Sequence, residues 1–390
     1  MRNIIIASFS FLLLIGCQKE QSKKDRFDWA QGNFEVKFSP NKPDFLEKIK
    51  PDITKFYQEN YAINDFSGGF LVAKNGQILF ERYEGYANFQ MKDTITPNKP
   101  LHIASISKVM TASVVLRLID QGFLQLDESI SRFFPKFKHK EVTVKTLLNH
   151  RSGLPIYAYF TANDTIWNHA KLLQNKDVIR LIIEKDIPLA SKPDTKFTYN
   201  NTNFVILALI IEKVTGLTYS KAMEKILFKP LGMTNTFVFE MDKHQDKVSE
   251  SYKSQYMRIA DDYLDAIYGD KNIYSTPRDI LKFDLALYSD NFLSKTLRES
   301  MFRGYSYENK GIKNYGLGIR LREWENGQKM FYHNGWWHGN TSAYVTLRKG
   351  AVTLIALSNK YSRQPYQIKC LSSLFGDYPF KLFEDEIVEE

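Results

Sequence analysis

The sequence predicts a mixed α/β (α+β) protein: one antiparallel sheet built from both chain ends, with flanking helices and an inserted, mostly helical lobe. Three observations predict this fold. Two early apolar runs, 69–73 and 77–80, flank Asn75-Gly76, which is a strong hairpin signal. The long middle of the chain has helical patterns, and four strand-like runs follow residue 315. An isolated hairpin is only marginally stable, so the early strands need the late ones as partners.

The individual elements are expected in the following order. A helix over 45–61, which includes Pro51, precedes the hairpin. The middle helices are predicted at 105–121, 143–149, 177–185, 203–214 and 219–228, and Thr276-Pro277 begins another that ends at 288. The late strands are predicted at 316–321, 329–333, 342–347 and 352–357, followed by a terminal helix over 366–375.

Composition excludes several classes of protein. Of the 390 residues, 43% are hydrophobic and 14% aromatic, so most of the chain is not disordered and it can bury a large core. Two cysteines exclude a disulfide scaffold and a Cys-rich zinc module. The net charge of +9 is spread along the chain, which indicates an ordinary solvated surface and no nucleic-acid-binding stripe.

The first residues are typical of an export signal. Residues 4–15 are almost all apolar but too few to span a bilayer as a helix. The run that ends in Gly16-Cys17 resembles the lipobox of bacterial lipoproteins, which implies cleavage before Cys17 and a lipid on that cysteine. Because Gln18 is not the aspartate that often marks inner-membrane retention, we expect a lipid-anchored protein of the bacterial cell envelope. The expected site is the outer membrane, on its periplasmic face or at the cell surface.

Ser105-Ile106-Ser107-Lys108 stands at the start of a predicted helix and is the first candidate for catalysis. Positions i and i+3 share a helix face, so Lys108 can reach Ser105. The N–H groups and partial positive charge at a helix start favour a developing oxyanion. The same Ser-x-x-Lys pattern over 39–42 contains a proline and lies in a polar linker, so we give it no role.

Two further motifs lie where functional residues are often found, one directly before a predicted helix and one directly after a predicted strand. Tyr199-Asn200-Asn201 directly precedes a long apolar helix, unlike the other Tyr-x-Asn matches in the chain. His333-Asn334-Gly335 is the sole His-x-Gly and follows a predicted strand.

The order of these motifs strongly resembles the class C β-lactamase-like serine hydrolase superfamily, which includes class C β-lactamases, DD-peptidases and family VIII esterases. The matching features are Ser-x-x-Lys, then Leu-Leu-Asn-His-Arg-Ser-Gly-Leu-Pro over 147–155, Tyr-x-Asn, Tyr-Gly-Leu-Gly over 315–318, and His-x-Gly. The resemblance covers nearly the whole mature chain. It implies a β-lactamase/transpeptidase-like fold.

The resemblance also implies a role for each matching residue. Ser105 would be the nucleophile that forms an acyl-enzyme. Lys108 and Tyr199 would carry the proton transfers, and which of them is the general base stays open. Asn201 would orient Lys108 and bind the substrate carbonyl.

The residues around His-x-Gly would bind substrate. The backbone N–H groups of Ser105 and Trp336 would form the oxyanion hole. His333 stands where true β-lactamases carry a lysine, so we expect an electrostatic and hydrogen-bonding role and a weaker attraction for a substrate carboxylate. Gly335, Trp336 and Trp337 would lie at the cleft, where an indole narrows the space.

These assignments divide the chain into three parts. They are a signal peptide over 1–16, the lipidated Cys17 with a polar linker to 44, and a serine hydrolase domain over 45–390. Within that domain we expect a sheet subdomain over about 45–122 and 272–390, and a helical subdomain over about 123–271.

We expect a serine hydrolase that acts on ester or amide bonds through an acyl-enzyme. An esterase or a peptidase on D-amino-acid or peptidoglycan-like peptides ranks above a β-lactamase. A protein of another class, a catalytically idle penicillin-binding-like recognition protein, is the alternative. No zinc-binding helix, phosphate loop or Gly-x-Ser-x-Gly elbow occurs, so we expect no metal and no cofactor. The expected partners are a small-molecule or peptide substrate and the membrane, with no nucleic acid, and the expected state is a monomer.

Overall fold

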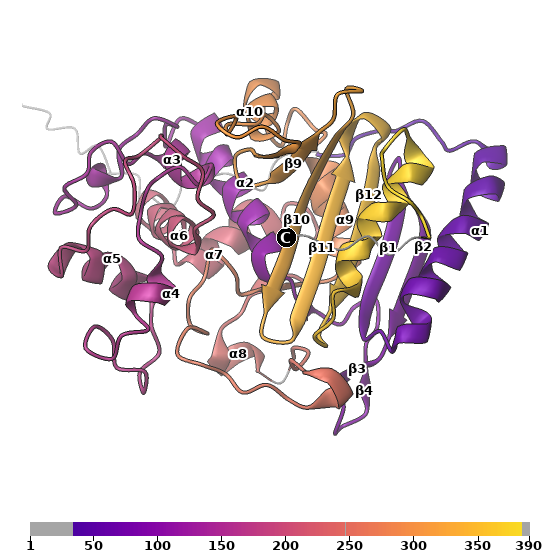
Figure 1. Cartoon of the computed structure of the whole chain (residues 1–390), viewed down its shortest axis with the longest axis horizontal. Coiled ribbons are helices and arrows are strands. Elements are labelled where there is room, and N and C mark those ends of the chain that lie inside the picture. Colours follow the sequence, from indigo (N-terminus) through magenta and orange to yellow (C-terminus); the bar gives the residue numbers. More distant parts are fainter. Residues whose placement is uncertain (1–33, 246, 384–390) are drawn as a thin grey trace, which may run out of the picture.

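The computed structural model describes residues 34–245 and 247–383, which form a mixed α/β structure with a sheet on one side and a helical lobe on the other (Figure 1). The predicted signal peptide, Cys17 and most of the predicted linker lie outside the described residues. Residues 34–42, the last part of that linker, already contact the body of the protein. The Phe34 ring, for example, meets the Phe292 ring edge-on at 5.6 Å.

One seven-stranded antiparallel sheet forms the centre of the structure, in the order β2-β1-β12-β11-β10-β9-β8. Its strands are β1 Gly68–Lys74, β2 Gln77–Glu84, β8 Lys313–Tyr315, β9 Arg320–Glu323, β10 Lys329–Trp337, β11 Asn340–Leu347 and β12 Val352–Ser358. β1 pairs with β12, from Gly68 opposite Ser358 to Lys74 opposite Val352. This pairing confirms the prediction of a sheet assembled from both chain ends.

The predicted hairpin joins β1 and β2 through Asn75 and Gly76. Both residues have positive φ, 52° and 75°, as a two-residue turn of type I′ requires. Asparagine and glycine tolerate this backbone conformation best, which explains the turn at this point of the sequence.

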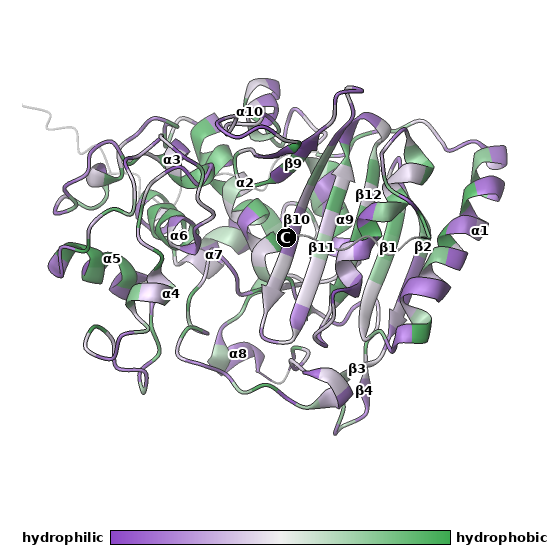
Figure 2. Cartoon of the chain, in the orientation of Figure 1, coloured by the Kyte–Doolittle hydropathy of each residue, from purple (hydrophilic) through white to green (hydrophobic). Residues whose placement is uncertain are grey.

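The two faces of the sheet belong to different cores. Phe70 and Val72 of β1 pack with α1 (Pro43–Asn60) and with the terminal 3₁₀ helix (Gln364–Phe375). Leu71 and Ala73 point the other way and join the larger core with α2 (Ser107–Asp120) and α9 (Pro277–Ala286). Successive strand residues face opposite sides, so one short strand serves both cores. The buried residues of α1, among them Ile49, Ile53 and Phe56, belong to the core that contains Phe70 and Val72, and Figure 2 shows hydrophobic and hydrophilic residues mixed along this helix.

The inserted lobe is mostly helical, as expected. Its helices are α3 Val144–Leu148, α4 Tyr157–Phe160, α5 Asn175–Glu184, α6 Asn201–Thr215, α7 Tyr219–Met223 with a π-helical continuation Glu224–Phe228, and α8 Met241–His244; α10 Lys295–Met301 follows α9. Short strands join the lobe to the sheet side: β3 Tyr86–Asn88 with β4 Asp93–Thr94, and β5 Leu101–His102 with β7 Ile273–Ser275 and β6 Phe237–Val238. α6 is buried on almost every side and forms the centre of the lobe.

Short 3₁₀ turns complete the described structure: Ala62–Asn64, Ala104–Ile106, Ile130–Arg132, Ser254–Tyr256 and Arg348–Gly350. Across residues 34–245 and 247–383, no single helix is long and apolar enough to cross a membrane. α6 and the helix after it meet that requirement only as a pair bent by 76°.

The prediction of one strand over 316–321 is wrong. Residues 316–319 instead form the bend between β8 and β9. Gly318 has a φ of 85°, and a Cβ there would lie 2.2 Å from the Ala112 side chain. The bend therefore packs directly on α2, and only glycine fits at this position. The terminal helix has 3₁₀ geometry and begins at Gln364, and β10 runs four residues beyond its predicted end.

Candidate active site

Ser105 lies in the 3₁₀ turn Ala104–Ile106, immediately before α2. Ala104 has a left-handed φ of 47°, a conformation that costs energy for a residue with a side chain and often marks a functional turn. Lys108, on the first turn of α2, donates from Nζ to Ser105 Oγ at 2.9 Å. The predicted i, i+3 reach of the lysine to the serine therefore exists as a hydrogen bond.

The Lys108 side chain is fully buried and its other contacts are uncharged. Its Nζ donates to the Asp270 backbone carbonyl at 2.7 Å. The ammonium also lies 5.2 Å from the centre of the Tyr199 ring and 5.9 Å from that of Phe204. These contacts fix the direction of the ammonium toward Ser105 Oγ without a carboxylate competing for its protons.

Tyr199 lines the same cavity as Ser105, between two cations. The guanidinium of Arg320 lies 4.6 Å from the centre of its ring, on the side of β9, and Lys108 approaches from α2. Both contacts are cation–π contacts with the Tyr199 ring, and they hold it against β9 and α2.

The segment over 147–155 holds the Tyr199 turn in place. The backbone N–H of Asn200 donates to His150 Nδ1 at 3.0 Å, and Asn200 Nδ2 donates to the Leu154 carbonyl at 2.6 Å. The Asn200 side chain also caps α6 by accepting from the Thr202 N–H. Burial, followed by the charges of Lys108 and Arg320, holds the pKa of His150 well below its ordinary value. His150 is therefore a neutral acceptor.

Asn201 lines the cavity at the first turn of α6. Its Oδ1 is buried and has no hydrogen-bond partner within the described part of the chain. The expected orientation of Lys108 by this oxygen is therefore not present. The oxygen is instead available to accept an N–H from a bound substrate.

Gly335 brings the end of β10 against the turn that carries Ser105. A Cβ at this position would lie 2.7 Å from the Ile103 carbonyl and 2.9 Å from the Ala104 Cβ. Glycine is required for this close approach. Trp336, the next residue, lines the same cavity as Ser105, and the oxyanion hole expected from their two N–H groups stays a prediction. β9 pairs with β10 only as far as Tyr332, so it does not cover this end of the strand.

The structure does not bring His333 to the cavity. The side chain is fully buried, with Nε2 3.2 Å from Tyr315 Oη and Nδ1 2.8 Å from the Asn334 carbonyl. Burial, followed by the charges of Arg320 and Lys108, holds its pKa well below the ordinary value. His333 is thus neutral and lies behind Tyr199, with the two ring centres 6.1 Å apart. It can act on the site only through its neighbours.

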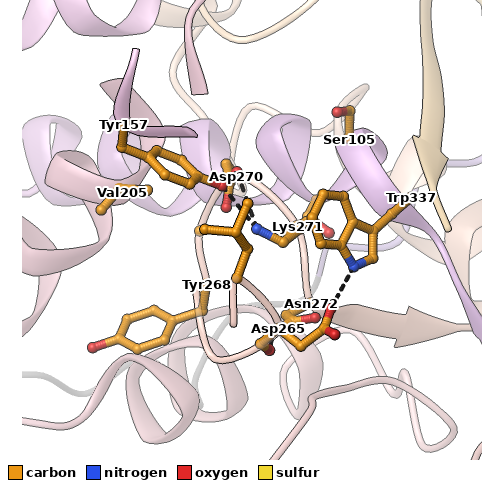
Figure 3. Close-up of polar contacts among 12 residues, drawn as sticks. Ser105, Tyr157, Val205, Asp265, Tyr268, Asp270, Lys271, Asn272 and Trp337 are labelled. Carbon is orange, nitrogen blue, oxygen red and sulfur yellow. Dashed lines mark hydrogen bonds and ion pairs between the residues drawn. The ribbon is translucent and has the colours of Figure 1, made fainter. Parts of the chain in front are cut away.

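Trp336 and Trp337 lie on opposite sides of β10. Trp336 lines the Ser105 cavity and is 59% exposed. Trp337 lines a second cavity, where its Nε1 donates to Asp265 Oδ1 at 2.7 Å and its ring packs against the Lys271 ammonium at 4.3 Å (Figure 3). Only one of the two indoles narrows the space at the nucleophile.

Four cations of the Ser105 cavity, which has a volume of about 290 Å³, were not among the site residues predicted from the sequence. They are Lys313, Arg320, Arg322 and Lys369. Figure 2 shows β9, which carries two of them, as a hydrophilic strand. Arginines at positions i and i+2 of a strand share one face, so the pair in β9 was the signal available in the sequence.

A buried polar network beside Lys108 was also missed. Lys271 Nζ donates to Tyr157 Oη at 2.8 Å, and Tyr157 Oη donates to Asp270 Oδ2 at 2.9 Å (Figure 3). Asp270 Oδ1 is buried and without a partner among the described residues. Burial lowers the pKa of Lys271, although Asp270 opposes this effect. The network fixes the loop whose Asp270 carbonyl holds Lys108.

Comparisons with known proteins identify the family of this chain. The family model described as Beta-lactamase matches residues 58–370. Penicillin-binding protein 4* of Bacillus subtilis (strain 168) is 31% identical over 333 residues, which cover 80% of this chain and 73% of that protein.

Two solved structures share the fold. A penicillin binding protein from Bacillus halodurans has a TM-score of 0.72 at 24% identity, over 83% of this chain and 99% of that one. A D-amino acid amidase from Ochrobactrum anthropi SV3 has a TM-score of 0.66 at 22% identity, over 84% and 97%. With the family model matching most of the chain and the fold shared, this protein belongs to the beta-lactamase family and is a serine hydrolase of that family.

Proposed function

We propose that this protein cleaves peptides that end in a D-amino acid with a free carboxylate. The observation that carries the proposal is the charge of the Ser105 cavity. Four cationic side chains line it besides the catalytic residues, and none of its described lining residues is acidic. Arginine and lysine bind carboxylates through charge-assisted hydrogen bonds. These cations replace the attraction that His333, neutral and buried, does not supply.

The catalytic cycle follows from the positions of the side chains. Ser105 Oγ attacks the carbonyl carbon of the last peptide bond while its proton passes to Lys108 or Tyr199. The N–H groups of Ser105 and Trp336 stabilise the oxyanion. The C–N bond breaks, and the proton passes to the leaving nitrogen of the D-amino acid. Water then hydrolyses the ester on Ser105 and releases the shortened peptide.

The relatives support this substrate class. One is a penicillin-binding protein at 31% identity, and one structural neighbour is a D-amino acid amidase. A β-lactam also carries a carboxylate, but Trp336 reduces the room for a fused ring system, so we rank β-lactams as poor substrates or slow acylating inhibitors. The bond between Lys108 and Ser105 argues against an idle recognition protein, because an unused serine needs no such partner.

A short-chain esterase is the second candidate function. Trp336 is the observation that favours it, since its half-exposed indole offers an apolar wall to a small acyl group. A short-chain ester has no carboxylate to bind the four cations. We therefore rank the esterase function second.

A matched set of substrates tests the proposal. Nα,Nε-diacetyl-L-Lys-D-Ala-D-Ala should be cleaved, and the same peptide with a C-terminal amide should have a kcat/KM lower by about tenfold or more, the value of a charge-assisted hydrogen bond. Arg320→Met should reduce this preference for the carboxylate. Lys310→Ala is the matched control, since Lys310 is an exposed cation that does not line the cavity. Cleavage of p-nitrophenyl acetate or nitrocefin with neither peptide cleaved would reject the proposal.

We also propose that the lipid on Cys17 holds a monomeric enzyme at the outer membrane, on its periplasmic face or at the cell surface. This proposal is supported by the lipobox-like sequence alone. Cys17→Ser should move the protein from the detergent phase to the aqueous phase in Triton X-114. A wild-type protein found in the aqueous phase would contradict it.

A further inference from the structure

We infer that a second cavity, beyond Trp337, binds a primary ammonium group carried by the acyl part of the substrate. This inference rests on the proposed function and extends it to the other end of the same peptide. The enzyme would then recognise a substrate with opposite charges on the two sides of the scissile bond.

The two cavities are neighbours that share the end of β10. The second has a volume of about 610 Å³, against about 290 Å³ at Ser105. Gly335 and Trp336 line the first, and Trp337 lines the second. In Figure 3 the Trp337 indole lies between Ser105 and Asp265. From Gly335, at the first cavity, to Trp337, at the second, the strand runs roughly 7 Å. A lysine-like side chain of the substrate can cover this distance, whereas the α-amine of its acyl residue cannot.

The second cavity has the opposite charge to the first. Four carboxylates line it, from Asp93, Glu250, Asp261 and Asp265, against one arginine and two histidines. Arg258 is paired with Glu250 at 3.4 Å, and Lys99 is paired with Asp93. Neither Asp261 nor Asp265 is paired with a lysine or an arginine within the described part of the chain; the partner of Asp265 is His338. The chain as a whole carries +9, so this local negative charge does not follow from composition.

Asp265 is the fixed acceptor of this cavity. Its side chain is 10% exposed, and its oxygens accept from Trp337 Nε1 at 2.7 Å, from His338 Nε2 at 2.9 Å and from the Asp262 N–H. A carboxylate has about four acceptor positions, so one remains for an ammonium. The hydrogen bond to Asp265 also raises the pKa of His338 against the effect of burial.

Two unsatisfied polar atoms belong to side chains that line the same cavity. Asn340 and Ser249 are 3% and 2% exposed, and neither Asn340 Oδ1 nor Ser249 Oγ has a hydrogen-bond partner in the described structure. A buried polar atom without a partner costs about 1–3 kcal/mol. An ammonium has three donors and suits a site that offers a carboxylate and further oxygen acceptors.

A metal ion is the competing ligand. Potential ligand atoms of Asp262, Asp265 and His338 lie within 4.8 Å of one another. A metal would have to replace the hydrogen bond between His338 and Asp265, and Asp262 is exposed. The ammonium keeps this bond, which favours it.

The test compares two peptides that differ in one charge. Nα-acetyl-L-Lys-D-Ala-D-Ala carries a free ε-amine, and the diacetyl peptide does not. We expect the free amine to raise kcat/KM by about tenfold or more. Asp261→Asn and Asp265→Asn should each lower the ratio of kcat/KM for the free-amine peptide to that for the diacetyl peptide toward one. Asp261 is exposed, so its variant remains informative if the buried Asp265 variant does not fold.

The control is Asp242→Asn, because Asp242 is an exposed carboxylate on α8 that does not line the cavity; its ratio should equal that of the wild type. Equal rates on both peptides would overturn the ammonium site and leave the proposed function intact. Cleavage of neither peptide would overturn both. If EDTA abolished the difference in kcat/KM between the two peptides and Zn²⁺ restored it, the ligand of this cavity would be a metal ion and not the ammonium group.

Discussion

The two sides of the Ser105 site are built in different ways. On one side Ser105 and Lys108 stand on the start of α2, whose residues are almost all buried and apolar. On the other side the loop over 261–272 carries three charged groups that face inward: Asp265, Asp270 and Lys271. The helix fixes the reacting atoms, and the loop supplies polar groups that need not take part in bond breaking. The proposed catalytic residues therefore stand on a rigid element, whereas the proposed ammonium site lies largely on a loop.

Removal of the nucleophile should have the largest effect. Ser105→Ala should lower turnover by at least about 10³-fold, because the acyl-enzyme cannot form. The melting temperature should stay close to that of the wild type, since the hydroxyl lies in an open cavity. Steady-state kinetics and thermal unfolding measure both. Turnover close to the wild-type rate would show that Ser105 is not the nucleophile.

Loss of either proton carrier should have the next largest effect. Lys108→Ala and Tyr199→Phe should each lower kcat by roughly 10²–10⁴. The double variant should lose less than the product of the two single losses, because both residues serve one proton transfer. Single-turnover rates measure this. Fully multiplicative losses would show that the two residues act in separate steps.

On the loop side, a single charge removal should mainly destabilise the fold. Lys271→Met leaves the fully buried Asp270 without its cation, which lies 3.6 Å away. Removing one partner of a buried pair costs about 3 kcal/mol or more. The double variant Asp270→Asn/Lys271→Met should regain most of that free energy of unfolding, measured by urea denaturation. If the double variant were as unstable as the single one, the loss of the Asp270–Lys271 ion pair would not be the cause of the destabilisation.

Acid should weaken the fold through its buried histidines. Burial is the main cause that lowers the pKa of His102, to about 4, and holds those of His150 and His333 well below the ordinary value. The unfolded chain binds these protons near pH 6.5. Stability is therefore fully present above about pH 6.5 and falls below it, by up to about 1.4 kcal/mol per pH unit for each histidine.

Urea unfolding at several pH values measures this slope. His102→Gln should reduce the slope between about pH 6.5 and 4, and His139→Gln, at a partly exposed position, is the control. A stability that rises as the pH falls through this range would contradict the expected sign.

Much of the fold could be predicted because its signals are local. Asn75-Gly76 defines a hairpin, and a hairpin without neighbours is unstable, so strands from both chain ends had to pair. The bend at Gly318 could not be predicted, because its cause is the approach of α2, which is far away in the sequence.

In the active site, too, local signals could be predicted from the sequence, whereas contacts between distant segments could not. Lys108 bonds to Ser105 and Tyr199 lines the Ser105 cavity, as expected, because each motif starts a helix. Trp336 and Trp337 had to lie on opposite faces, since side chains alternate along a strand. The sequence does not show which face meets Ser105. The burial of His333 and the partners of Asp270 and Lys271 depend on contacts between distant segments, so the sequence alone gave no signal for them.

The position of a covalent adduct tests the central claim most directly. The wild-type protein is treated with a fluorophosphonate or a slowly released β-lactam, digested, and analysed by peptide mass spectrometry. We expect one adduct, on the peptide that contains Ser105, and none in Ser105→Ala. An adduct on the peptide that contains Ser39, or no adduct in a preparation that turns over a peptide substrate, would contradict it.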